Sequence, residues 1–206
     1  MKRYDDLEQG SDEWLAFRSG RPTASEFKKL ITSTGEPSKS MKDYAIQLAA
    51  EKYAGKYLDR WQGNQYTEAG HEREELARNH YEFTTGETVE QTGFVTDDEI
   101  TCGFSPDGIV NDDGLIEIKC LSAKEHVKAI QYCNKNGKPP TTYTQQVQGQ
   151  MMIMDRKWCD MVFYHPDLPS CIIRCEPILE VVEGLKAQIK AVNAMRDAIL
   201  SELKWT

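Results

Sequence analysis

The sequence predicts an α/β fold in which helices flank a central mixed β-sheet. Apolar residues recur at helical spacing before residue 85 and after residue 176, whereas short alternating segments separated by turn residues lie between residues 88 and 121. The chain has 206 residues and no repeat, low-complexity tract or Pro/Ser-rich linker, so we expect a single domain, residues 1–206. A doubly wound nucleotide-binding fold is not expected, because the sequence has no glycine-rich phosphate loop.

Four helices are expected in the first part of the chain. Ser11 is a favourable N-cap for the first helix, and Thr23 with Glu26 fits the capping-box pattern at the start of the second. The third carries Tyr44 and Leu48 at helical spacing. The expected helices cover residues 11–19, about 23–31, 40–57 and 67–83.

Strands and helices alternate in the second part of the chain. Short runs of β-branched and aromatic residues, bounded by Gly, Asn and Asp, predict strands over residues 88–95, 100–104, 108–110, 115–121, 158–164 and 171–176. Helical spacing predicts helices over residues 122–133, 142–155 and 177–204. This alternation is typical of a mixed sheet covered by helices.

The composition limits the classes of function. The formal net charge of −8 argues against a surface that binds nucleic acid indiscriminately, although basic residues could still line one concave surface. The apolar runs are far too short for a membrane span, and the first residues lack the apolar segment of a secretory signal. The six cysteines form no CxxC pair, which favours reduced thiols in a cytoplasmic protein. A metal or iron–sulfur site using Cys171 and Cys175 is the alternative.

One segment brings together residues that can hydrolyse a phosphodiester. Asp107 lies in a Pro-Asp-Gly turn, and Glu117 and Lys119 follow within an apolar run. Because side chains alternate along a strand, Glu117 and Lys119 share one face. The turn formers at residues 111–114 predict a hairpin that returns Asp107 towards Glu117. Two carboxylates and a lysine at the end of a sheet can hold divalent cations and position a water beside a phosphodiester.

Each of these residues has a plainer interpretation when it is taken alone. Glu-x-Lys pairs are frequent on solvated strand faces, and Asp after proline is a usual turn residue. The combination is more specific, because burying Lys119 without a partner would be costly. A catalytic site is therefore favoured over surface decoration.

Five motifs occur in order between residues 14 and 151. They are W-x-x-x-R-x-G-x-x-T-A-S at 14–25, G-x-x-x-E at 70–74, Ser-Pro-Asp-Gly at 105–108, the Glu-x-Lys strand at 115–119 and Q-x-Q at 146–148. Together they resemble the PD-(D/E)xK nuclease superfamily, and within it the phage lambda-type exonucleases, the YqaJ-like viral recombinases. The resemblance implies the restriction-endonuclease-like core of that superfamily.

The resemblance also implies metal ligands. Asp107, Glu117 and the backbone carbonyl of Ile118 would hold Mg²⁺, with Mn²⁺ as an alternative and two ions in each active site. Glu74 would complete the acidic cluster. Its plainer interpretation is a solvated helix residue beside two arginines.

Two further residues are implied to act on the reaction itself. Lys119 would orient or help to deprotonate the attacking water and stabilise developing phosphate charge. Gln146 would hydrogen-bond near Lys119 and the nucleophile. The plainer interpretation of Gln146 is an ordinary polar position on a helix.

Arg18, Ser25 and Ser105 resemble the family's pocket for a terminal 5′-phosphate. Arginine grips phosphate with two N–H groups, and a helix N-terminus would add backbone donors at Ser25. Arg18 could instead be a surface charge and Ser25 an early-helix residue. Pro22 departs from the family's usual residue before T-A-S.

The loop before the Glu74 helix is where this family inserts a wedge that splits the terminal base pair. Trp61, Gln65 and Tyr66 lie in this loop. An aromatic side chain could act there by stacking on a base. A hydrophobic anchor would have the same sequence pattern.

Taken together, the resemblance implies a Mg²⁺-dependent 5′→3′ exonuclease. It would digest one strand of linear double-stranded DNA to 5′-mononucleotides and leave a 3′ single-stranded tail for recombination. The resemblance also implies a ring-shaped homotrimer and a single-strand annealing protein as partner. It implies no membrane association and a location in the cytoplasm of a bacterium that carries the phage or prophage.

Three rival functions follow from the same residues. A structure-specific or restriction-type endonuclease keeps the fold but changes the substrate. A Cas4-like iron–sulfur nuclease conflicts with the scattered cysteines. A non-catalytic DNA-end-binding module is disfavoured because Asp107, Glu117 and Lys119 are all present.

Overall fold

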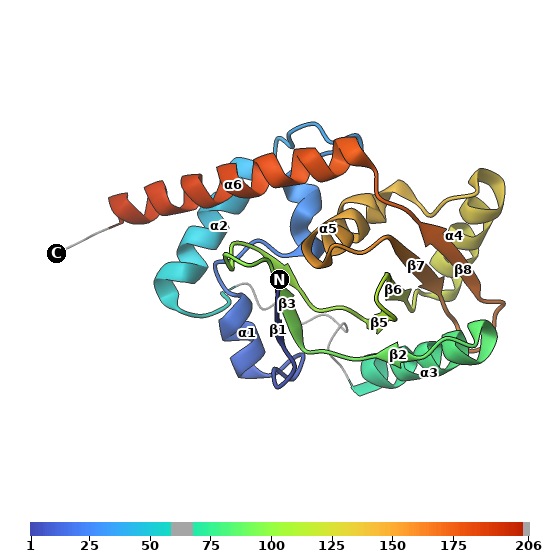
Figure 1. Ribbon diagram of the computed structural model, residues 1–206. Helices are drawn as coiled ribbons and strands as arrows, with labels where there is room; N and C mark the ends of the chain where they lie inside the picture. The colour runs from blue at the N-terminus through green and yellow to red at the C-terminus, as the bar shows by residue number, and fades with distance from the viewer. Residues whose placement is uncertain (59–67, 204–206) are drawn as a thin grey trace.

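The computed structural model describes residues 1–58 and 68–203, which form two β-sheets with helices packed on them (Figure 1). The larger sheet has the strand order β2-β5-β6-β7-β8. It is mixed, because β6 and β7 are parallel while the other neighbours are antiparallel. Its strands are β2 (Val89–Glu90), β5 (Gly108–Val110), β6 (Gly114–Lys119), β7 (Trp158–Phe163) and β8 (Cys171–Cys175). A central mixed sheet flanked by helices confirms the predicted fold class.

The smaller sheet is antiparallel and contains the N-terminus. Its strands are β1 (Lys2–Tyr4), β3 (Phe94–Thr96) and β4 (Gly103–Phe104), in the order β1-β3-β4. Sequence patterns did not predict β1, because three residues without apolar alternation carry no strand signal. Its pairing with β3 comes from tertiary structure.

The helices agree with the predicted ranges to within a few residues. They are α1 (Asp12–Arg18), α2 (Met41–Ala54), α3 (Glu68–Thr85), α4 (Ala123–Asn136), α5 (Thr144–Met154) and α6 (Leu179–Glu202), with 3₁₀ turns η1 (Ala24–Lys29) and η3 (Thr141–Tyr143). Ser11 caps α1 as predicted, since its side chain accepts the N–H of Trp14. Within the described residues, no helix combines the length and apolar character needed to cross a membrane.

Three predicted elements differ from the structure. The helix expected from residue 23 is the 3₁₀ turn η1, and its capping box is absent because the Thr23 hydroxyl contacts Arg18 and Ser25 instead. The strand expected over 88–95 is divided into β2 and β3, which belong to different sheets. The strand expected over 100–104 is reduced to β4, because Asp97 accepts the backbone N–H groups of residues 101 and 102 in a turn.

Strand β6 lies between two apolar cores. Ile116 and Ile118 face α3 and pack with Ala77 and Tyr81 of that helix. Leu115 faces the larger core, to which α5, α6 and η1 contribute. Glu117 and Lys119, in the alternate positions, therefore project towards α5, as the period of two predicts.

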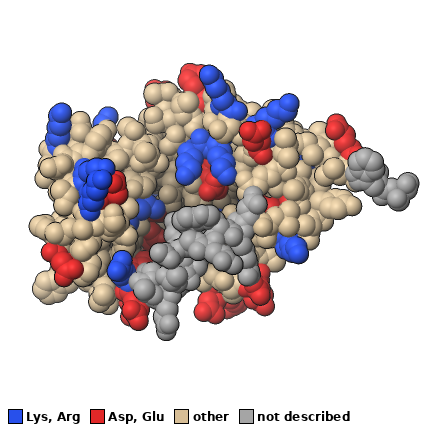
Figure 2. Space-filling model, turned by 180° about the vertical axis from the view of Figure 1, so that it is seen from behind, with Lys and Arg blue, Asp and Glu red and all other residues tan. Residues whose placement is uncertain are grey.

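Charge is unevenly distributed between two helices that flank this sheet. Helix α3 contains five acidic and two basic residues, whereas α4 contains three lysines and one glutamate. On the face shown in Figure 2, Asp and Glu side chains line the lower edge and most Lys and Arg side chains lie above them.

Candidate active site

The predicted hairpin is present and brings Asp107 beside β6. Strands β5 and β6 pair with Gly108 opposite Ile116, so Asp107 comes next to the end of β6. The backbone N–H of Ile118 donates to Asp107 Oδ2 at 2.6 Å. The turn therefore fixes one carboxylate against the strand that carries the other.

The carboxylate of Glu117 is held by three donors. Its side chain is 2% exposed, and Oε1 accepts from Lys119 Nζ at 2.5 Å and from Gln146 Nε2 at 2.6 Å. Gln150 Nε2 donates to the other oxygen, Oε2, at 2.5 Å. Donors from β6 and α5 thus hold this buried charge in one orientation. We call Asp107, Glu117, Lys119 and Gln146 the catalytic cluster, after the role that the sequence predicts for them.

Lys119 is a cation in this setting. Burial alone would lower the pKa of Lys119, but the carboxylates of Glu117 and Asp107 together raise it above its usual value. Its Nζ also lies 5.4 Å from the centre of the Tyr143 ring and 3.5 Å from Gln146 Oε1. A protonated Lys119 can stabilise negative charge and donate a hydrogen bond.

The surroundings of Asp107 disfavour its ionised form. Burial raises the pKa of Asp107 well above its usual value, and the nearby carboxylates of Glu117 and Glu74 raise it further. Added positive charge would therefore be favourable at this position. Hard oxygen donors of this kind suit Mg²⁺, so the side chains of Asp107 and Glu117 and the carbonyl of Ile118 fit the ion chemically. As the described side chains stand, no three His, Cys, Asp or Glu residues converge on one metal position.

Helix α3 connects Glu74 to the catalytic cluster through an arginine. Arg78 Nη2 donates to Glu74 Oε1 at 2.8 Å, and Arg78 Nε donates to the backbone carbonyl of Asp107 at 3.1 Å. In the sequence, Arg78 is one of two arginines close to Glu74 and has no other distinguishing feature. The spacing of four residues between Glu74 and Arg78 is the signal that could have identified the pair.

The buried Asp160 joins α3 to the sheet, together with the half-exposed Arg174. Tyr81 of α3 donates to Asp160 Oδ2 of β7 at 2.9 Å, and Arg174 of β8 donates to both oxygens of Asp160 at 2.8 Å. These bonds connect β7 and β8 to α3, the helix that carries Glu74. The position of Glu74 therefore depends on side chains far from it in sequence.

The four glutamines on α5 contact three different parts of the structure. Gln146 and Gln150, one turn apart, contact Glu117. Gln148 donates to the carbonyl of residue 176 and accepts the N–H of Ile178, which joins α5 to the start of α6. Gln145 donates to the carbonyl of Ile31. Only Gln146 was predicted in the site; the position of Gln150 four residues later was the available signal for the second contact.

Ser105 and Arg18 are connected by Trp14. The indole N–H of Trp14 donates to Ser105 Oγ at 2.7 Å, and Ser105 Oγ donates to the carbonyl of Gly93 at 2.7 Å. The Arg18 guanidinium lies over the Trp14 ring, 4.2 Å from its centre. The hydroxyl proton of Ser105 is thus committed to the backbone. We call Arg18, Ser25 and Ser105 the Arg18 group.

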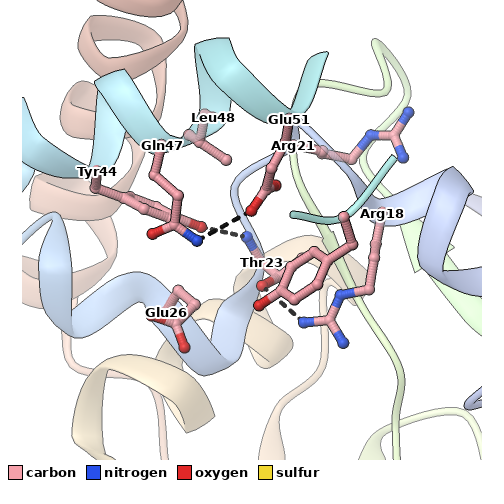
Figure 3. A pocket seen from close by; sticks show the side chains of 9 residues that line it. Arg18, Arg21, Thr23, Glu26, Tyr44, Gln47, Leu48 and Glu51 are labelled. Carbon is pink, nitrogen blue, oxygen red and sulfur yellow. Dashed lines mark hydrogen bonds between the residues drawn. The ribbon is translucent and has the colours of Figure 1, made fainter. Parts of the chain in front are cut away.

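A small hollow lies beside Arg18 (Figure 3). It is lined by Arg18, Arg21, Thr23, Glu26, Tyr44, Gln47, Leu48, Glu51 and Tyr57. Arg18 Nη2 lies 3.4 Å from Thr23 Oγ1, which lies 3.3 Å from Ser25 Oγ. Its volume of about 10 Å³ has room for about one water. A phosphate would need the surrounding side chains to move apart.

The loop after α1 is fixed by helices from both ends of the chain. Gly20 has φ of +66°, and a Cβ there would lie 2.5 Å from the Cβ of Lys52. Its N–H donates to Glu51 Oε2 of α2 at 3.0 Å, and its carbonyl accepts from Arg196 Nη1 of α6 at 2.8 Å.

The predicted wedge residues Trp61, Gln65 and Tyr66 lie outside the described residues.

Comparison with known proteins identifies the family. The model of the YqaJ-like viral recombinase domain matches residues 13–157. No curated protein sequence gives a significant match. The chain is similar to the alkaline exonuclease LHK-Exo from Laribacter hongkongensis, with 33% identity, a TM-score of 0.81 and coverage of 94% of this chain and 96% of that one. A second structure of LHK-Exo, in complex with dAMP, matches to the same extent.

A more distant structure supports the fold. A phage-related exonuclease from Haemophilus somnus 129PT has 18% identity and a TM-score of 0.70, and the match covers 89% of this chain and 96% of that one. The expected PD-(D/E)xK fold is confirmed by these structural matches. Since the family model covers most of the chain and LHK-Exo is similar over nearly its whole length, the protein belongs to the YqaJ-like viral recombinase family.

Proposed function

We propose that this protein is a Mg²⁺-dependent 5′→3′ exonuclease acting on the ends of double-stranded DNA. The observation that carries the proposal is the catalytic cluster, in which Asp107, Glu117 and Lys119 converge in a chain of this recombinase family. LHK-Exo, the similar protein, is itself an alkaline exonuclease and has been crystallised with dAMP, a nucleoside monophosphate. A 5′-mononucleotide is the product that the proposed reaction releases.

Each residue of the catalytic cluster has a task in hydrolysis. Asp107, Glu117 and the Ile118 carbonyl would hold Mg²⁺, which supplies positive charge at the scissile phosphate. Lys119 donates to the phosphate oxygen on which negative charge grows, because its raised pKa keeps it protonated. Gln146 fixes Glu117 and lies within 3.5 Å of Lys119, so it orients both groups. Glu74, held by Arg78, adds negative charge near Asp107 and strengthens attraction for a cation.

End recognition is assigned to the Arg18 group. Arg18 supplies the charge that attracts a terminal 5′-phosphate, and its planar guanidinium matches the phosphate oxygens. Ser105 supports Trp14, on which Arg18 is stacked. Ser25 is exposed on η1 and offers its hydroxyl next to Thr23.

The family supports a proposal for the biological setting. We place the enzyme in recombination of a phage or prophage in the bacterial cytoplasm, where its 3′ single-stranded tails would be passed to an annealing protein. A homotrimeric ring would keep the duplex enclosed during successive cuts. A native mass of three chains is the expected result, and a monomer would contradict the ring.

The test compares three DNA substrates in the presence of Mg²⁺. Linear duplex with 5′-phosphates should be degraded quickly, linear duplex with 5′-hydroxyls more slowly, and covalently closed circles not at all. Label at the 5′ end should appear first as mononucleotide, since digestion starts there. Cutting of closed circles at a similar rate would replace the exonuclease with the alternative, a structure-specific or restriction-type endonuclease. Early release of 3′ label would reverse the polarity.

A further inference from the structure

Helix α4 presents a row of basic side chains to solvent. Lys124, Lys128, Gln131 and Lys135 recur at intervals of four, three and four residues, so they form one stripe along the helix. All four side chains are exposed. The buried side chains of α4 lie on the opposite face of the helix: His126, Ala129 and Cys133.

The charged side chains of the stripe itself are all lysines. The whole protein carries a net charge of −8, and α3 on the other side of β6 is strongly acidic. The one acidic residue of α4, Glu125, pairs with Lys128 at 2.9 Å, and both side chains are more than half exposed. Such an exposed pair contributes little to stability and gives way readily to a phosphate.

The stripe begins close in sequence to the catalytic cluster. Helix α4 starts four residues after Lys119, and Lys124 lies in its first turn. From Lys124 to Lys135 the stripe is about 16 Å long, given a helical rise of about 1.5 Å per residue. Lys138 follows directly after Gly137, which ends the helix in a left-handed conformation. Basic groups therefore follow the strand that carries Glu117 and Lys119 closely along the chain.

The chemistry of the stripe selects duplex DNA rather than a single strand. Proteins that hold single strands combine basic residues with aromatic side chains on which bases stack. The one tyrosine of α4, Tyr132, lies beside the stripe but is partly buried, and the exposed positions of the helix, all of which the structure describes, contain no aromatic residue. Lysine and glutamine side chains without an exposed stacking surface contact the sugar–phosphate backbone and read no sequence. We propose that the outer face of α4 binds the phosphate backbone of the duplex not yet digested; this rests on the proposed DNA-end function.

The experiment measures the salt dependence of binding to a blunt duplex of about 20 base pairs in EDTA, where no cutting occurs. One variant replaces Lys124, Lys128, Lys135 and Lys138 by Gln. The control variant replaces Lys39, Lys157, Lys186 and Lys190 by Gln, four exposed lysines elsewhere. Both variants change the net charge equally, and the control also breaks two exposed pairs, Lys157–Asp113 and Lys186–Glu183.

The α4 variant should bind at least tenfold more weakly than wild type at low salt. Its slope of log affinity against log salt should fall by about 0.9 for each lost phosphate contact, up to about 3.6 in total. A third variant with Arg at the same four positions should restore both quantities. Single-turnover cleavage at saturating enzyme should be unchanged, because these lysines do not touch the reacting atoms.

The outcomes distinguish a failure of the α4 proposal from a failure of the proposed exonuclease function. If the α4 and control variants have equal slopes of log affinity against log salt while the wild type cuts linear duplex, α4 does not bind the duplex. The proposed exonuclease function would then be unaffected. Wild type that neither binds nor cuts duplex ends would overturn both. A larger loss for a single strand of the same length than for the duplex would reject duplex as the occupant.

Discussion

The catalytic cluster and the Arg18 group are held together in contrasting ways. Three donors reach the Glu117 carboxylate at 2.5 to 2.6 Å, and they come from two neighbouring elements, β6 and α5. Arg18 instead stacks on Trp14 and reaches Thr23 at 3.4 Å, beside a hollow of about 10 Å³. The groups that would perform the chemistry are preorganised, whereas the groups that would recognise an end have to open before a phosphate can enter.

The strongest way to break the catalytic cluster is to remove the charge of Lys119. Lys119→Met keeps most of the side-chain volume but leaves Glu117 without its cation. We expect the rate of nucleotide release from linear duplex to fall by about 1,000-fold or more, since one charge-stabilising donor is worth about 100- to 1,000-fold and the metal ligand loses its support too. Lys157→Met, at an exposed position, should keep the wild-type rate. A loss of less than tenfold for Lys119→Met would exclude a direct role.

Replacing Arg18 tests whether the Arg18 group recognises DNA ends. Arg18→Ala should slow cutting of 5′-phosphorylated duplex by about 100-fold, in line with about 2 to 3 kcal/mol for a charge-assisted contact. Cutting of 5′-hydroxyl duplex should change little. Arg18→Lys should fall between the two, because lysine keeps the charge but not the planar fork. Equal losses on both substrates would mean that Arg18 acts through folding and not through the phosphate.

Replacing Gln150, which contacts the catalytic cluster, tests how far the firm hold on Glu117 matters for metal binding. Gln150→Leu removes the donor to Glu117 Oε2, so half-maximal activity should require about tenfold more Mg²⁺. Gln145→Leu is the matched control. Both glutamines are buried on α5 and both have a side-chain oxygen without a hydrogen-bond partner, but Gln145 bonds to Ile31. An equal change in Mg²⁺ requirement for the two variants would show that helix packing alone is being measured.

The smallest expected effect concerns stability. The pKa of Asp107 is raised in the folded protein, so its ionised form destabilises the fold. The stabilising contribution is complete below the unfolded pKa of about 3.9 and is lost as the pH rises through the folded value. At pH 7 in EDTA, Asp107→Asn should therefore raise the free energy of unfolding by about 1 kcal/mol and Tm by about 2–4 °C.

Metal addition provides the control for that variant. Mg²⁺ should raise Tm of the wild type, because a ligand that binds only the folded state stabilises it. The same addition should leave Tm of Asp107→Asn nearly unchanged. A lower Tm for this variant in EDTA would mean that the hydrogen bond from Ile118 outweighs the repulsion between carboxylates.

The sequence predicted the catalytic cluster better than the Arg18 group for a physical reason. Asp107, Glu117 and Lys119 belong to one hairpin, whose geometry follows from turn residues and a period of two. Gln146 needed a resemblance to place it, because nothing local brings α5 over β6. Its neighbour Gln150 was missed, because the spacing of four residues after Gln146 places it on the same side of the helix but does not distinguish contact with a carboxylate from contact with water.

Long-range backbone contacts account for the missed and divided strands. β1 exists through pairing with β3, ninety or more residues away in the chain. The segment between β2 and β3 contains Gly93, where an added Cβ would overlap the carbonyl of Leu7. Such close approach between distant segments is invisible to local periodicity. Ser105 illustrates the same limit, because its hydroxyl is used by Trp14 and Gly93 within the fold.

The contact between Arg196 and Gly20 sets an order of events during protein synthesis. The two residues are 176 positions apart, and Asn193 of the same helix donates to the carbonyl of Thr101, four residues before Ser105. The segments that carry Arg18 and Ser105 are therefore fastened only after α6 has emerged from the ribosome. A nascent chain holds the hairpin of β5 and β6 well before it can complete this fastening, so we expect the Arg18 group to reach its final arrangement only after α6 has been made.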